Sequence, residues 1–187
     1  MRLDRIYTRG GDKGLTSLGD GSRVPKFDLR VQGCGGLDEA NAAIGVALLH
    51  VEDEEVRAVL QLAQNDLFDV GADISRPGHE TETPPRLRVT EEQTLRVERH
   101  IDRFNESLQP LTSFILPGGS PASAYLHHAR TVVRRAERDI AELASRESVN
   151  PEALKYVNRL SDLLFVLARY CNERGAADVL WVPGGGR

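Results

Sequence analysis

Aromatic residues and cysteines are scarce in this 187-residue sequence: aromatics make up 5% of it, and there are only two cysteines. A core with so few aromatic side chains must consist of Leu, Val, Ile and Ala, which favours packed helices over a β-sandwich. Cys34 and Cys171 lie far apart in the sequence, and neither belongs to a pair with metal-ligand spacing. We therefore expect two reduced thiols rather than a disulfide framework.

The sequence also lacks an excess of positive charge and any long apolar run. Its 28 acidic residues outnumber the 24 basic ones, which argues against a nucleic-acid-binding protein, because such proteins neutralise phosphates with a basic surface. The longest strongly apolar stretch, residues 163–168, is too short to span a bilayer, and residues 1–10 contain no apolar segment typical of a signal peptide. These absences predict a cytoplasmic protein with no nucleic-acid and no membrane partner.

Several catalytic motifs are absent as well. The sequence contains no H-E-x-x-H motif and no E-x-x-H pair, which argues against zinc-protease and di-iron sites. It has no G-x-S-x-G segment and no G-K-[ST] tripeptide, so neither a nucleophile elbow nor a Walker A loop is expected. Cys34 lies among glycines with no evident base beside it, which argues against a nucleophilic thiol. The sequence assigns no metal ligands.

The sequence does contain a glycine-rich first segment, up to about residue 36, followed by five segments with helical periodicity. Apolar residues recur at spacings of three and four over residues 37–51, 56–74, 90–108, 120–145 and 150–175. The last two segments open with Ser120-Pro121 and Asn150-Pro151, each a capping residue followed by proline at the first helical position. Residues 75–89 and 110–119 are expected to be loops.

This pattern predicts an all-α fold, an up-and-down five-helix bundle with a glycine-rich N-terminal arm. We expect a single domain over residues 1–187. Its parts are the arm over residues 1–36, the helical bundle over residues 37–175 and a tail over residues 176–187.

A line of polar residues follows the 120–145 helix beside its apolar stripe. His127, Arg130, Arg134 and Glu137 are spaced by three, four and three residues, so they share one face. Two arginines one turn apart can clamp a polyphosphate, because guanidinium groups bind phosphate oxygens bidentately. The alternative is an ordinary solvated face, and the residues alone do not decide between the two.

The neighbouring arginines of the same helix have a simpler interpretation. Arg135 and Arg138 lie four residues before Asp139 and Glu142, a spacing that predicts solvated ion pairs along the helix.

Two further groups of residues leave alternatives open. Asn158 and Asp162 lie one turn apart on the 150–175 helix, either as a ligand-binding pair or as a buried, hydrogen-bonded structural pair. In residues 8–17, small residues let backbone N–H groups approach an anion, while Lys13, Thr16 and Ser17 add charge and donors. The alternative for that segment is a flexible glycine-rich arm.

Several segments together resemble the PduO-type ATP:cob(I)alamin adenosyltransferases. The N-terminal signature of that family resembles residues 6–17 (IYTRGGDKGLTS) and 21–26 (GSRVPK). Its second signature resembles residues 113–119 (SFILPGG) and 130–138 (RTVVRRAER), and its third resembles residues 157–165 (VNRLSDLLF). The segments occur in the family's order, and the resemblance runs from Tyr7 to about Arg174.

The resemblance implies a homotrimer whose active sites lie between subunits. There, the 5′-deoxyadenosyl group of ATP would pass to the cobalt of cob(I)alamin, with Mg²⁺ present and triphosphate released. The ATP-binding residues that it implies are Thr8, Arg9, Gly10, Gly11, Thr16, Ser17, Lys26, Arg134, Arg135, Glu137, Arg138 and Asn158. The cobalamin-binding residues that it implies are Phe114, Asp38 and Arg130, which together with Arg134 would carry catalysis. This assignment gives Arg135 and Arg138 a second interpretation beside the solvated ion pairs.

The residue types suit the reaction that the resemblance implies. The cobalt is itself the nucleophile, so no catalytic base is needed, whereas the leaving triphosphate needs positive charge. Reduction to cobalt(I) becomes easier when the lower axial ligand is removed, and Phe114 matches the apolar side chain that occupies this face in the family. Asp38 and Arg130 match a pair that closes the corrin site. No D-x-H-x-x-G segment supplies a histidine to replace the axial base.

The resemblance implies two kinds of protein partner, a flavoprotein or other reductase and an adenosylcobalamin-dependent enzyme. One alternative is a protein that binds adenosylcobalamin and delivers or senses it with little turnover. Another is an ATP-binding helical module without a corrinoid site. The resemblance does not cover residues 75–89 or the tail, where Trp181 is a candidate to close over the corrin.

Overall fold

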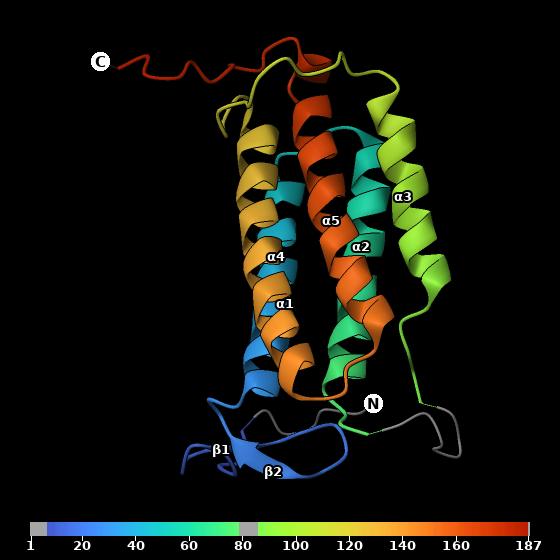
Figure 1. The fold of residues 1–187 in the computed structure, drawn as a ribbon, viewed down its shortest axis with the longest axis vertical. Helices are drawn as coiled ribbons and strands as arrows, with labels where there is room; N and C mark the ends of the chain where they lie inside the picture. Colours follow the sequence, from blue (N-terminus) through green and yellow to red (C-terminus); the bar gives the residue numbers. More distant parts are fainter. Residues whose placement is uncertain (1–6, 79–85, 187) are drawn as a thin grey trace.

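Five helices form the body of the computed structural model, which describes residues 7–78 and 86–186 (Figure 1). They are α1 (Leu29–Leu48), α2 (Glu54–Ile74), α3 (Glu91–Asn105), α4 (Pro121–Arg146) and α5 (Pro151–Tyr170). Successive helices run in opposite directions, which confirms the all-α, up-and-down five-helix bundle. Ile6 of the first signature and residues 79–85 of the 75–89 loop lie outside the described residues.

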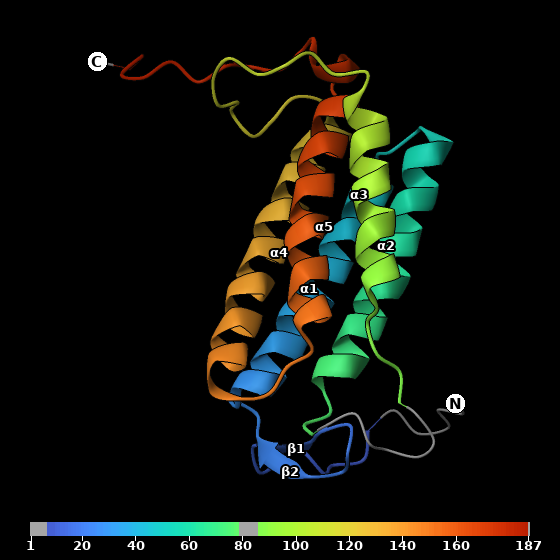
Figure 2. The same cartoon turned by 45° about the vertical axis from the view of Figure 1, so that its right-hand side comes forward.

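The helices pack as expected for a core poor in aromatic residues. α4 lies between α1 and α5 and contacts both along its length, while α3 packs on the outer side of α5 (Figure 2). The buried core consists almost entirely of Leu, Val, Ile and Ala, with Phe104 and Tyr156 as its aromatic members. None of the helices among the described residues is both long and apolar enough to cross a membrane.

Two short strands extend below the bundle and carry part of the glycine-rich arm (Figure 1). β1 (Leu15–Ser17) pairs antiparallel with β2 (Arg23–Pro25). The hairpin is tied to the bundle by the backbone N–H of Gly19, which donates to the carbonyl of Ser75 at 2.9 Å. Arg30 follows the hairpin; its buried guanidinium donates to the carbonyl of Ile74 at 2.5 Å and to Glu147 at 2.6 Å. These contacts hold the arm at one end of the bundle.

The first helix begins earlier than the sequence indicates. α1 starts at Leu29 rather than at residue 37, and Asp28 caps it by accepting from the Arg30 N–H at 2.9 Å. The predicted arm boundary at residue 36 is therefore wrong, because the three glycines at 33, 35 and 36 lie inside the helix. Glycine disfavours helices, yet close packing requires it here: a Cβ on Gly36 would lie 3.1 Å from the Cα of Ala136. At their ends, α3 stops at Asn105 and α5 at Tyr170, followed by the short 3₁₀ helix η1 (Glu173–Gly175).

Two adjacent glycines of α1 give opposite expectations for stability. Gly36→Ala is expected to lower the free energy of unfolding by about 1–3 kcal/mol, because its methyl group would force α1 away from α4. Gly35→Ala is the matched control: a Cβ there has nothing within 4 Å, so stability is expected to rise by about 0.5–1 kcal/mol. Urea unfolding of both variants tests the close approach, and equal effects would contradict it.

Candidate active site

The glycine-rich turn of the arm lies against the side chain of Lys26. Arg9 adopts a left-handed backbone conformation with φ 58°, and Gly14 does the same with φ 78°. The backbone N–H of Lys26 donates to the carbonyl of Gly14 at 2.9 Å. Its side chain lies so close to Gly11 that a Cβ on the glycine would be 3.1 Å from the lysine Nζ. The structure thus brings a cationic group to the turn that also contains Thr8 and Gly10, as an anion site requires.

Arg23 fastens this turn, a role that the sequence did not indicate. Its guanidinium donates to the carbonyl of Gly10 at 2.6 Å and to the hydroxyl of Ser17 at 3.1 Å. The hairpin register places Ser17 opposite Arg23 and Thr16 opposite Val24. Arg23 belongs to the segment 21–26 that carries part of the resemblance. Its contacts depend on the register of two short strands, which cannot be predicted from the sequence pattern.

On the polar surface of α4 and α5, the Glu137 carboxylate links the two helices through a hydrogen bond. Glu137 accepts a hydrogen bond from the Asn158 side-chain amide at 2.8 Å, and the Asn158 carbonyl oxygen accepts from Arg159 at 2.6 Å. Asp162 is exposed, and its carboxylate lies 3.8 Å from the Arg159 guanidinium. The buried Asn158–Asp162 pair, one of the two alternatives, is therefore not formed. Asn158 joins the α4 line instead.

The solvated ion pairs predicted along α4 are also wrong. Arg135 forms its ion pair with Glu39 of α1, and Arg138 donates to the carbonyl of Arg134 at 3.1 Å. Glu142 pairs with Arg146. Side-chain rotamers and the neighbouring helix decide between such partners, and spacing in the sequence does not contain that information.

Arg134 is exposed on α4. Within residues 7–78 and 86–186, its guanidinium has no hydrogen-bond or ion-pair partner. Arg130, one turn away, lies over the Phe165 ring at 5.4 Å and likewise has no anionic partner within hydrogen-bond distance in that part of the chain. Burial first, and then the charge of Arg134, lower the pKa of Arg130, while Asp162 opposes the shift. Two mutually repelling cations that form no ion pair within the described residues are suited to receive an external polyanion.

Next to Arg130 is an apolar hollow of about 790 Å³. It is lined by Leu111, Ser113, Phe114, Ile115, Pro117, His127, Arg130, Phe165 and Trp181. Phe114 is 77% exposed at its edge, although it is a large apolar side chain. The structure thus places Phe114 and Arg130 at one hollow, as expected, and adds His127 and Phe165, which the sequence analysis did not assign to it.

The C-terminal tail forms one wall of the hollow. The backbone N–H of Trp181 donates to the backbone carbonyl of Phe114 at 2.7 Å, and the two rings meet edge to face with centroids 6.1 Å apart. The tail is anchored by Asp178, which accepts from Arg169 at 2.8 Å and from the Asn172 amide at 2.9 Å. Arg169 and Asp178 are both buried side chains, so this anchor fixes Trp181 beside Phe114.

Asp38 is not brought to Arg130 within one chain. It lines a different hollow of about 380 Å³ between α1 and α2, together with Cys34 and Phe68. Phe68 is 68% exposed there. Burial raises the pKa of the Cys34 thiol to about 11, which agrees with the expected lack of a nucleophilic role. Both cysteines are free thiols.

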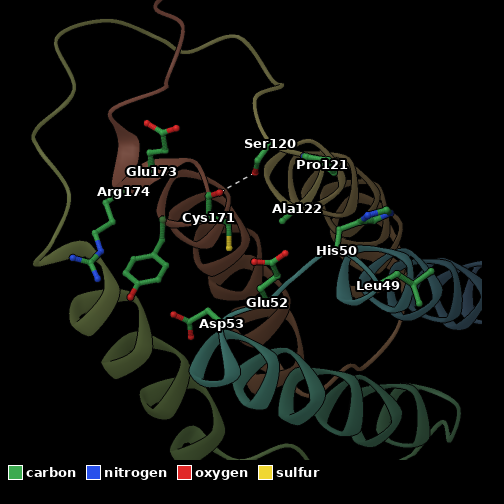
Figure 3. A pocket seen from close by; sticks show the side chains of 11 residues that line it. Leu49, His50, Glu52, Asp53, Ser120, Pro121, Ala122, Cys171, Glu173 and Arg174 are labelled. Carbon is green, nitrogen blue, oxygen red and sulfur yellow. Dashed lines mark hydrogen bonds between the residues drawn. The ribbon is translucent and has the colours of Figure 1, made fainter.

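A cavity of about 620 Å³ lies at the opposite end of the bundle from the hairpin (Figure 3). None of the residues predicted to bind ATP or cobalamin lines it. Residues at the ends of α1, α2, α4 and α5 line it, and Ser120 donates to the carbonyl of Cys171 at its edge at 2.8 Å. The Asp53 carboxylate is already used to cap α2. Burial raises the pKa of the Cys171 thiol to about 11.

Nowhere in the described part of the chain do three or more His, Cys, Asp or Glu side chains gather so as to hold a metal ion.

Comparisons with known proteins decide the family. The profile of the family described as cobalamin adenosyltransferase matches residues 6–171. This chain belongs to that family. A corrinoid adenosyltransferase from Mycobacterium tuberculosis (strain ATCC 25618 / H37Rv) is 53% identical over 190 residues, covering 100% of this chain and 97% of the relative. A cobalamin adenosyltransferase from Cupriavidus metallidurans is 47% identical over 182 residues, covering 96% of this chain and 95% of the relative.

The fold comparison agrees with the family assignment. A variant PduO-type ATP:corrinoid adenosyltransferase from Lactobacillus reuteri, solved as a complex with cobalamin and ATP, matches with a TM-score of 0.88. It is 34% identical, and the match covers 95% of this chain and 96% of that one. The resemblance stated from the sequence is confirmed, and the chain is an enzyme, a corrinoid adenosyltransferase. The alternative of an ATP-binding module without a corrinoid site is therefore wrong.

Proposed function

We propose that this enzyme transfers the 5′-deoxyadenosyl group of ATP to the cobalt of cob(I)alamin, at a site shared by two subunits of a homotrimer. One observation carries the proposal above all others. Arg130 and Arg134 form no ion pair among the described residues, and Arg130 lines an apolar hollow whose rim is an exposed phenylalanine. A polyanion and a large, flat, largely apolar ring bound side by side would satisfy both features.

The nucleotide would lie between the arm and the polar surface of α4. In the arm, Lys26 and the glycine turn held by Arg23 offer charge and backbone N–H groups to phosphates. On the helices, Arg134, Arg135 and Arg138 supply cations, while the linked Glu137 and Asn158 supply hydrogen-bonding groups for the nucleoside. Because the described residues build no metal cage, Mg²⁺ is expected to arrive on the triphosphate itself, as this ion commonly does.

The chemical step needs positioning and charge rather than a base. The electron pair of cobalt(I) forms the bond to C5′ of ATP, and the C5′–O bond breaks, so that triphosphate leaves with its electron pair. Arg134 would stabilise the charge that develops on the leaving oxygens. Phe114 would occupy the lower face of the corrin, where it excludes an axial ligand and water. Arg130 would contact both substrates, since it lies at the hollow and one turn from Arg134.

The second subunit enters because Asp38 and Arg130 line separate hollows of one chain. In a trimer, the α1–α2 surface with Asp38 and exposed Phe68 would meet the α4 surface of a neighbour. Asp38 would then pair with the neighbour's Arg130 and close the corrin site. The chemistry also calls for a reductase that supplies cob(I)alamin, a flavoprotein or another type, and for an adenosylcobalamin-dependent enzyme that uses the product.

Complementation between two defective subunits tests this proposal. Asp38→Ala and Arg134→Ala are each expected to be nearly inactive alone, because each removes one half of every shared site. In every mixed trimer one of the three sites receives both intact halves, so about a third of the wild-type activity should return. Activity is measured as cob(I)alamin loss on trimers purified through a different tag on each variant. Mixed trimers without recovered activity would contradict a shared site.

A further inference from the structure

We propose that His127 is a further positioning residue of the corrinoid site, and that its imidazole forms a hydrogen bond with a primary amide on the edge of the corrin ring. This inference rests on the proposed function and adds a polar contact to a hollow whose lining is mostly apolar. His127 lies on the first half of α4, one turn before Arg130.

The imidazole is buried but not satisfied. Its side chain lines the Phe114 hollow, yet the residue is only 3% exposed. The Nδ1 atom is inaccessible and has no hydrogen-bond partner anywhere in the part of the chain that the structure describes. The ring packs edge to face against Phe165, with centroids 6.0 Å apart. An unpaired buried polar group costs free energy, and a small turn of the ring toward the adjoining hollow on binding would give Nδ1 a partner that comes with the ligand.

The protonation state of the ring suits an amide partner. Burial first, and then the charge of Arg130, lower the pKa of His127, while Asp178 opposes the shift. The ring is therefore neutral at pH 7 and offers one N–H donor and one acceptor nitrogen. The corrin periphery bears primary amides, which also offer both a donor and an acceptor. A neutral imidazole is a poor ligand for triphosphate, and that role falls to the adjacent arginines.

The burial of His127 also argues against coordination to cobalt. An axial ligand must project toward the centre of the ring, whereas His127 is recessed and Phe114 projects from the rim. The amides project outward from the corrin edge and can reach a recessed partner. The contact is thus expected to orient the ring over Phe114 without adding an axial nitrogen.

Two variants of the full-length enzyme separate this role from a purely structural one. H127L keeps a similar volume but removes both nitrogens, and we expect it to raise the KM for cob(I)alamin about tenfold. We expect H127N, which keeps a polar group near the position of Nδ1, to recover most of that loss. The KM for ATP should change less than about twofold in both variants, because the ATP-binding arginines are intact. An unchanged corrinoid KM in H127L, or equal changes in both KM values, would overturn the inference.

Two further tests examine the bound corrinoid itself. Cobinamide keeps the ring amides but lacks the nucleotide loop of cobalamin, so its binding should weaken about as much in H127L as that of cobalamin. A loss confined to cobalamin would assign the contact to the nucleotide loop and overturn the proposal. In EPR spectra of bound cob(II)alamin, we expect no axial nitrogen in either protein. An axial nitrogen present in the wild type and absent in H127L would place His127 on the cobalt instead.

The wild-type enzyme distinguishes this inference from the proposed function beneath it. If wild type neither binds cob(II)alamin nor turns over cob(I)alamin with ATP, the proposed function itself fails. If wild type is active and H127L matches it in every constant, only the role of His127 is rejected.

Discussion

Arg134→Ala is expected to lower kcat by about a thousandfold or more, the largest effect of any single substitution in this enzyme. The side chain is exposed and has no protein counter-charge among the described residues, so its removal leaves the fold intact. What is lost is the cation that stabilises the leaving triphosphate. Steady-state turnover under anaerobic conditions, with kcat and both KM values determined separately, measures the effect.

Two further variants make this result specific. Arg134→Lys keeps the charge but loses the bidentate geometry, and we expect an intermediate loss of kcat. Arg146→Ala removes another exposed arginine of α4, one that pairs with Glu142, and should leave turnover nearly unchanged. A near-normal rate for Arg134→Ala, or equal losses for Arg134 and Arg146, would contradict the phosphate role.

Phe114→Ala is expected to reduce kcat/KM for cob(I)alamin by about a hundredfold, because a phenyl group that becomes buried on binding contributes about 2–3 kcal/mol. The side chain is 77% exposed before substrate binds, and its only ring contact among the described residues is with Trp181. Truncation should therefore cost little stability. The KM for ATP should stay near its wild-type value, since the hollow and the arm are separate.

A matched change elsewhere on the surface controls for general loss of apolar area. Leu95 on α3 is 40% exposed and lies outside both hollows described above, so Leu95→Ala should leave both KM values unchanged. A parallel rise of the ATP and corrinoid KM values in Phe114→Ala would indicate a disturbed fold rather than a lost corrin contact.

Most of the fold could be predicted from the sequence because helical periodicity is a local property. The spacing of apolar residues located all five helices, and the Ser120-Pro121 and Asn150-Pro151 signals fixed the starts of α4 and α5. The sequence predicts the start of α1 too late, because three glycines in its first turns are typical of a loop. Only the approach of Ala136 from another helix explains why Gly36 belongs inside a helix.

The arrangement of site residues could be predicted where they lie on one helix. It could not be predicted where residues from different helices meet. Arg130, Arg134 and Glu137 share a face of α4, as their spacing indicates. The partner of Asn158 and the ion pair of Arg135 come from neighbouring helices, so spacing along one helix suggested the wrong contacts. His127 was read as part of the polar line, and its position in the apolar hollow depends on how the 110–119 loop folds over α4.

The same reasoning explains why the tail could not be placed. Trp181 was a candidate to close over the corrin, and it does line the hollow. Its position follows from the buried Arg169–Asp178 pair, which joins α5 to the tail. Arg169 belongs to the polar line of the 150–175 helix, but the sequence does not connect it with Asp178, because an aspartate in a tail is an ordinary surface feature.

The most direct test of the central claim is an anaerobic reaction of the wild-type enzyme with ATP, Mg²⁺ and chemically reduced cob(I)alamin. The cob(I)alamin absorbance and the released triphosphate are followed together. Adenosyl transfer predicts that the cob(I)alamin band disappears while triphosphate forms in equal molar amount. A folded, trimeric protein that retains adenosylcobalamin tightly but releases no triphosphate would contradict the transfer and favour delivery or sensing of adenosylcobalamin.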